Sequence, residues 1–249
     1  MHRFISGALY PIYATTVLAR APRLWRYVLI PILVNLLVGA TVYAALLYAG
    51  LSAIDSLVAG LPAWAAALGA LLRLLLIVVL LIATGFVLVR FGVVLGAPWY
   101  TQLSAQLELL RGGQPLTTHG SRLSAALRDL SRALAFELRK LLLVLAIGTL
   151  LLLLNLLPVA GPLLTTAGWI ALGATITCLD FFDYPLERRL LSFRAKLRIV
   201  RRSLPASAGF GLVCLALVSI PFVNLLSIPL CVAAGTLFFC DRIDLSAHK

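Results

Sequence analysis

The longest uninterrupted hydrophobic stretch of the chain runs from Leu141 to Leu179 and contains no charged residue. Its middle, from Asn155 to Pro162, holds two prolines and a glycine. A proline inside a helix removes a backbone donor and clashes with the preceding turn, which argues against one continuous helix. The pattern predicts two helical arms of about 17 residues, each about 25 Å long against a hydrocarbon core of about 30 Å. We expect a hairpin that either just spans a membrane or enters it and returns.

A second uncharged stretch, Ala206–Cys240, repeats this pattern, with prolines near its middle between Ile220 and Pro229. Its arms are about 15 and 11 residues long, or about 22 and 16 Å, so the second arm is too short to cross a membrane alone. Arg202 precedes the stretch and Arg242 follows it, which indicates that both ends lie on the same side. Proline-broken segments in corresponding positions point to a transport site.

The two proline-broken apices indicate where an anion would bind. A helix that restarts after Pro162 or Pro229 directs unpaired N–H groups and its positive end into the membrane interior. Backbone amides near Gly161 and Ser227 are therefore candidate anion ligands. Irregular backbone at that depth needs protein or water around it, so we expect the helices to assemble around a cavity.

The first half of the chain predicts an ordinary spanning hairpin. Its helices are Tyr27–Gly50 and Leu74–Val89, and the segment Gly50–Pro62 contains Asp55 but no Lys or Arg, as an external loop does. Pro98 is expected to kink or end the second helix. Arginines precede the first helix, which places that end in the cytoplasm.

Three further segments have the pattern of helices that lie at a membrane surface. Met1–Ala21 is interrupted by polar residues and is interpreted as an interfacial leader helix. Leu123–Leu138 carries leucines at steps of three and four, and Pro185–Leu204 combines an apolar stripe with a basic remainder, its helix starting at Pro185. The predicted fold class is an all-α polytopic membrane protein with a single domain over residues 1–249. It contains one spanning helical hairpin, two proline-broken hairpins and amphipathic interfacial helices.

Composition supports this class and narrows the function. Hydrophobic residues make up 62% of the chain and the mean hydropathy is +1.05, which excludes an ordinary soluble domain. Membrane insertion selects basic cytoplasmic loops, so the net charge of +12 indicates no nucleic-acid partner, although it suits an anion. The three histidines lie outside the apolar runs, and no catalytic or metal-binding motif appears, so we expect no enzyme, cofactor or metal. The four cysteines are expected to be free thiols.

Several motifs resemble the CysZ family of sulfate permeases, part of the wider etoposide-induced membrane protein family. The motifs that carry the resemblance are Leu156–Gly161, Asp183–Arg188, Gly209–Gly211 and Ile220–Pro229. The order of the elements follows the family through nearly the whole chain. The resemblance implies sulfate uptake for cysteine synthesis by an assembly of subunits in the bacterial inner membrane, without a nucleotide-binding domain.

The resemblance also implies an anion-handling turn, Pro-Gly-Leu-Arg-Arg, at the start of the first membrane helix. The matching residues in this chain are Pro22, Arg23, Leu24, Trp25 and Arg26. Leu24 and Arg26 carry over, whereas Arg23 replaces the glycine, which limits close approach of the backbone to an anion but adds a charge. The substrate-binding residues expected from the sequence are Arg23, Leu24, Arg26, Gly161 and Ser227.

We therefore expect a permease or channel for sulfate or a related oxyanion, embedded among membrane lipids and working as a homo-oligomer. The alternative is a non-transporting organiser whose amphipathic helices bind or curve anionic membrane. Both broken hairpins lack Asp, Glu, His, Lys and Arg, which favours a passive, channel-like route over proton coupling.

Overall fold

The computed structural model describes residues 1–59, 62, 66–113, 122–157, 160–220 and 223–243, with side chains described for all of these except 66, 86–95, 122–131 and 133. All regular structure in this described part is helical, which confirms the predicted all-α class. The elements are α1 (His2–Ala8), α2 (Tyr10–Arg20), η1 (Pro22–Leu24), α3 (Trp25–Val58), α4 (Ala66–Leu110), α5 (Arg122–Leu154), α6 (Ala160–Glu187), α7 (Phe193–Arg202), α8 (Ala206–Ser219) and α9 (Val223–Arg242).

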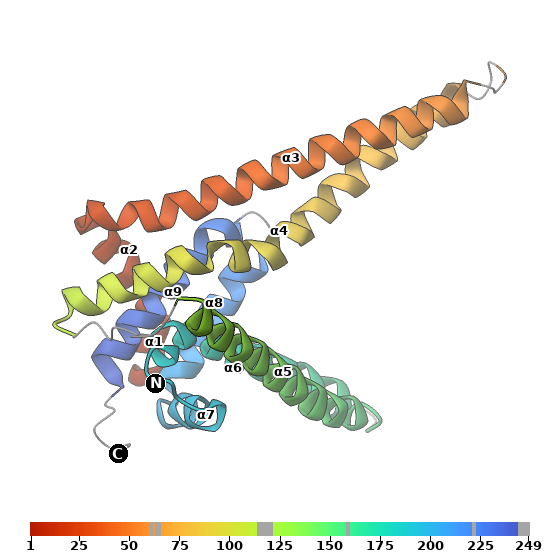
Figure 1. Cartoon of the computed structure of the whole chain (residues 1–249). Coiled ribbons are helices and arrows are strands. Elements are labelled where there is room, and N and C mark those ends of the chain that lie inside the picture. The colour runs from red at the N-terminus through yellow and green to blue at the C-terminus, as the bar shows by residue number, and fades with distance from the viewer. Residues whose placement is uncertain (60–61, 63–65, 114–121, 158–159, 221–222, 244–249) are drawn as a thin grey trace.

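Two long helical hairpins project in different directions from a central cluster of shorter helices (Figure 1). One hairpin consists of α3 and α4, and the other of α5 and α6. α9 lies in the cluster, where it contacts α2, α3, α4, α6 and α8. The segment expected as one leader helix forms two, α1 and α2, which pack on α8 and α9. The two ends of the chain therefore meet in the same cluster.

The first spanning hairpin is confirmed, but its helices are longer than predicted. α3 continues past Gly50 to Val58, so most of the expected external loop is helical. α4 continues through Pro98, so of the two outcomes expected there, a kink or an end, the end is wrong. A stripe of fully buried side chains follows the proline: Tyr100, Leu103 and Leu107. Each contributes about 1.5–3 kcal/mol on burial, so together they outweigh the cost of an interior proline, about 3 kcal/mol.

The hairpin predicted for the long uncharged stretch is confirmed, because α5 ends at Leu154 and α6 begins at Ala160. The helix start expected at Pro185 is wrong, since α6 passes through this proline to Glu187. Buried side chains on both sides of the proline hold α6 regular, among them Phe181, Phe182 and Leu186. The basic segment therefore becomes helical only at α7.

The start of α7 is set by a local cap. The Ser192 side chain accepts a hydrogen bond from the Ala195 amide at 3.4 Å, which satisfies one of the unpaired donors of the first turn. α7 is consequently a helix of 10 residues, shorter than the predicted segment Pro185–Leu204. Its end before Pro205 is as expected.

The last hairpin breaks where predicted, between the end of α8 at Ser219 and the start of α9 at Val223. Pro229, however, lies inside α9, which has 20 residues. The prediction of a second arm too short to cross a membrane is therefore wrong. Helices on several sides bury most of α9, and this packing offsets the cost of the proline.

Within the described residues, four segments are long and apolar enough to cross a membrane: Pro22–Val58, Ala67–Gly85, Ala160–Glu187 and Val223–Arg242. α7 and α8 reach this length and apolarity only when they are taken together, and the two helices are bent by 105° at their junction. Large apolar side chains are exposed along both projecting hairpins, and their contact with water would be unfavourable. These surfaces suit lipid, so the chain is a multi-pass membrane protein.

The central cluster is held by ring stacking and by close helix contacts. Phe182 stacks on both Phe210 and Phe238, with ring centroids 5.0 Å apart in each pair. α1 lies so close to α8 that a Cβ added at Gly209 would come 2.1 Å from the Phe4 carbonyl oxygen. Only glycine fits this contact, because the obstructing atom belongs to the backbone and cannot rotate away.

Replacement of Gly209 by alanine is expected to force α1 away from α8 and to cost about 1–3 kcal/mol, as overpacked sites do. The measurement is the thermal unfolding midpoint of the purified protein in detergent. Gly85→Ala is the matched control, because no atom lies within 4 Å of a Cβ built at Gly85 in α4. An equal fall in both variants would contradict the close contact of α1 with α8.

Candidate functional site

The turn predicted to handle an anion lies at the junction of η1 and α3. Leu24 is buried, whereas Arg23 and Arg26 are exposed on either side of it. The Arg26 guanidinium donates a hydrogen bond to the Tyr27 hydroxyl at 2.6 Å and lies 4.6 Å above the centre of that ring. Leu24 thus anchors the turn, and two guanidinium groups remain at the surface.

The two predicted backbone ligands lie near the starts of α6 and α9. The Gly161 amide donates to the Leu157 carbonyl oxygen at 3.0 Å, so an anion there would have to displace this bond. Ser227 is the fifth residue of α9, beyond the four N–H groups that a helix leaves unpaired. Asn224, the second residue of α9, lies nearer to the helix start, although its backbone amide already donates to the Ile220 carbonyl oxygen at 3.1 Å.

Asn224 is the most unusual polar residue in this region. Its side chain is 1% exposed, and neither its oxygen nor its nitrogen forms a hydrogen bond with a described residue. Asn35, also buried, lies on α3, a helix that contacts α9. An unpaired buried amide costs about 1–3 kcal/mol, so a ligand or water that pairs with the Asn224 side chain would recover this cost. Asn224 was part of a sequence motif but was not predicted as a ligand.

A buried ion cluster joins α4 to the connection between α6 and α7. The Glu108 side chain is 6% exposed and accepts from Arg188 at 2.5 Å and from Arg189 at 3.1 Å. Arg188 also donates to the Ser104 hydroxyl at 2.9 Å. The Thr236 hydroxyl of α9 donates to that same Ser104 oxygen at 2.8 Å, which connects a third helix to the cluster.

Sequence reasoning did not single out Glu108, although a signal was present. It is the only acidic residue between Asp55 and Asp129, and leucines flank it on both sides. An isolated carboxylate in such a setting needs a cationic partner. Its partners lie 80 and 81 residues further along the chain, and a periodicity analysis does not connect such distant positions.

Three further described acidic residues form ion pairs with basic ones. Lys196 is bound by both Asp183 and Glu187, and Arg111 pairs with Asp241 at 3.5 Å. Asp244 lies outside the described residues.

Lys140, at the end of the charged part of α5, is also held by two carboxylates. It lies 2.5 Å from Asp180 and 2.8 Å from Glu137. Burial alone lowers the pKa of Lys140, but these two carboxylates outweigh burial and raise its pKa above the ordinary value. Lys140 therefore stays protonated beside the uncharged stretch.

Comparison with known proteins identifies similar chains. The family model described as "Sulfate transporter CysZ/Etoposide-induced protein 2.4" matches residues 10–229. A protein of Pseudomonas aeruginosa named "Sulfate transporter CysZ" is 30% identical over 221 residues, covering 88% of each chain. Proteins with the same name from Vibrio cholerae and Pectobacterium atrosepticum are 29% and 26% identical. The match to the Vibrio cholerae protein covers 88% of this chain and 87% of that protein. The match to the Pectobacterium atrosepticum protein covers 95% of this chain and 85% of that protein.

Replacement of Glu108 by glutamine is expected to destabilise the protein by about 3–5 kcal/mol, because it leaves two largely buried guanidinium groups without their carboxylate. Glu137→Gln is the matched control, since the Glu137 side chain is mostly exposed and such pairs contribute about 1 kcal/mol or less. Thermal unfolding of both variants in one detergent measures the difference. Similar midpoints for the two would show that the Glu108 cluster does not hold the helices together.

Proposed function

We propose that this chain, which belongs to the sulfate transporter CysZ/etoposide-induced protein 2.4 family, forms a membrane permease or channel for sulfate or a related oxyanion. The observation that carries the proposal is the similarity to proteins named sulfate transporters over most of their length. The several membrane-length helices supply a setting in which such a route is possible.

A route for a divalent oxyanion must replace the water that the ion loses. Guanidinium groups and fixed N–H dipoles do this best, because both are donors that remain oriented towards the ion. In the proposed route Arg23 and Arg26 attract the anion at the surface, with Leu24 holding the turn in place. Their exposure and the surplus positive charge of the chain support this role.

Inside the protein we propose that the anion, or the water that accompanies it, passes the first turn of α9. Asn224 supports this step because its amide nitrogen is buried and uncommitted among the described residues. The backbone amides near Gly161 and Ser227, at the two proline-broken apices, are further proposed anion ligands. The Gly161 amide would exchange the Leu157 carbonyl for the anion during passage.

The cellular setting is part of the same proposal. We infer a place in the bacterial inner membrane with the basic segments in the cytoplasm, a homo-oligomeric assembly, and a role in supplying sulfate for cysteine synthesis. The two broken hairpins carry no Asp, Glu, His, Lys or Arg, which supports passive conduction. Residues 1–249 are taken as one membrane domain.

The alternative of a non-transporting membrane organiser is not favoured. The family description and the names of the similar proteins refer to transport of sulfate rather than to membrane shape. They also name a transporter and not an enzyme, which supports the interpretation that the chain is not catalytic.

Expression of the chain in a bacterial strain that lacks sulfate uptake is expected to restore accumulation of labelled sulfate. Arg26→Ala should lower this uptake about tenfold, because one charge-assisted contact contributes at least that factor. Arg20→Ala is the control, since it removes an equally exposed arginine from the end of α2, outside the turn. Unchanged uptake in Arg26→Ala at equal protein level would remove this residue from the route.

A further inference from the structure

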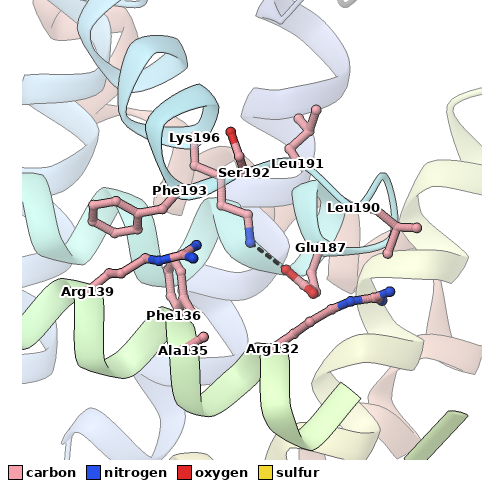
Figure 2. Close-up of a pocket in the computed structure, with 10 residues that line it drawn as sticks. All are labelled: Arg132, Ala135, Phe136, Arg139, Glu187, Leu190, Leu191, Ser192, Phe193 and Lys196. Atoms are coloured by element: carbon pink, nitrogen blue, oxygen red, sulfur yellow. Dashed lines mark hydrogen bonds and ion pairs between the residues drawn. The ribbon is translucent and has the colours of Figure 1, made fainter. Parts of the chain in front are cut away.

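A pocket of about 310 Å³ lies between α5 and the connection from α6 to α7 (Figure 2). This volume is at the lower end of the range for ligand sites, about 300–1,000 Å³. The charged residues that line the pocket are Arg132, Arg139, Lys196 and Glu187. Lys196 and Glu187 pair with each other at 2.5 Å, and Arg139 adds an exposed guanidinium group that can meet an anion. None of the residues predicted from the sequence to bind substrate lies here.

The positive charge that a ligand would meet comes from Arg139 of α5 and not from Lys196. Lys196 is 2% exposed, is paired with Asp183 and with Glu187 at 2.5 Å, and lies 4.6 Å from the centre of the Phe136 ring. Its charge is therefore compensated. Arg139, by contrast, is exposed and forms no hydrogen bond or ion pair with any described residue (Figure 2).

The first turn of α7 adds to this positive potential. Ser192 and Phe193, which begin α7, both line the pocket. The start of a helix of this length carries a partial positive charge and donor N–H groups, and anions are stabilised there. The pocket thus combines the exposed guanidinium group of Arg139 with a helix N-terminus from α7.

The surface of α5 next to the pocket is apolar towards the α5–α6 turn. The uncharged run of α5 starts at Leu141, two residues after Arg139. Leu138, Leu142 and Leu145 are each more than half exposed along this part of α5. At a rise of about 1.5 Å per residue, the last of them is about 9 Å from the level of Arg139. Leu190, exposed as well, lines the pocket itself.

We propose that this pocket binds the phosphate of an anionic phospholipid, with Arg139 as the charged donor. A basic pocket directly beside a lipid-facing leucine surface matches the two parts of such a lipid, a charged head and an apolar tail. The shared chemistry is a tetrahedral oxyanion, and the adjoining leucines favour the lipid over a free anion. The proposal does not depend on the transport function, because it concerns how the α5–α6 hairpin is fixed in the membrane.

The test titrates the purified full chain in neutral detergent with phosphatidylglycerol or with phosphatidylcholine of the same acyl chains, and counts bound lipid by native mass spectrometry. The wild type is expected to prefer phosphatidylglycerol. Arg139→Gln should reduce that preference about tenfold, the effect of one charge-assisted hydrogen bond. Arg198→Gln, an exposed α7 residue outside the pocket, should leave it within about twofold.

Two results would overturn the proposal. Equal losses in Arg139→Gln and Arg198→Gln would mean that the basic surface attracts lipid without a defined site. Displacement of phosphatidylglycerol by equimolar inorganic phosphate or sulfate would mean that the pocket binds free anions instead of lipid. Both readouts measure lipid binding alone, so failure of sulfate uptake would leave them unaffected.

Discussion

A buried carboxylate must be neutralised where water is excluded, and in this protein Glu108 imposes that requirement. Its two arginines come from the segment after α6, and its neighbour Ser104 contacts Thr236 of α9. One ionic cluster thereby fixes three helices relative to one another. The hairpins α3–α4 and α5–α6 both end near it, so their directions depend on this contact (Figure 1).

The polar groups of the chain are distributed according to what each must contact. Ion pairs at the bases of the hairpins are compensated within the protein, as with Lys140 and Lys196. Along the projecting hairpins the exposed side chains are mainly leucines, which need lipid. Asn224 is the exception, because it is buried in an apolar helix without compensation among the described residues. That contrast is why the proposed route includes the first turn of α9.

The sequence predicted the helical class, the hairpins and a break in the long uncharged stretch, which lies between Leu154 and Ala160, because helices satisfy their own backbone groups in lipid and prolines interrupt them. The helix boundaries expected at Pro185 and Pro229 were wrong, since α6 and α9 continue there, and α4 passes through Pro98 without ending. At those positions packing from distant segments outweighs a local cost of about 3 kcal/mol, and a local pattern does not reveal such contacts. The pairing of Glu108 was missed for the same reason, whereas the turn residues Arg23 and Arg26 were found through the resemblance and remain predictions.

Passage of sulfate past Asn224 is measured by labelled-sulfate uptake into liposomes that contain only this purified chain, with Asn224→Leu reconstituted beside it. The wild type is expected to accumulate sulfate, and Asn224→Leu is expected to accumulate at least about tenfold less. The variant should nevertheless unfold at the same or a higher temperature, since removal of an unpaired buried amide is neutral or stabilising. Sulfate uptake by the wild type no greater than by empty liposomes would contradict the account.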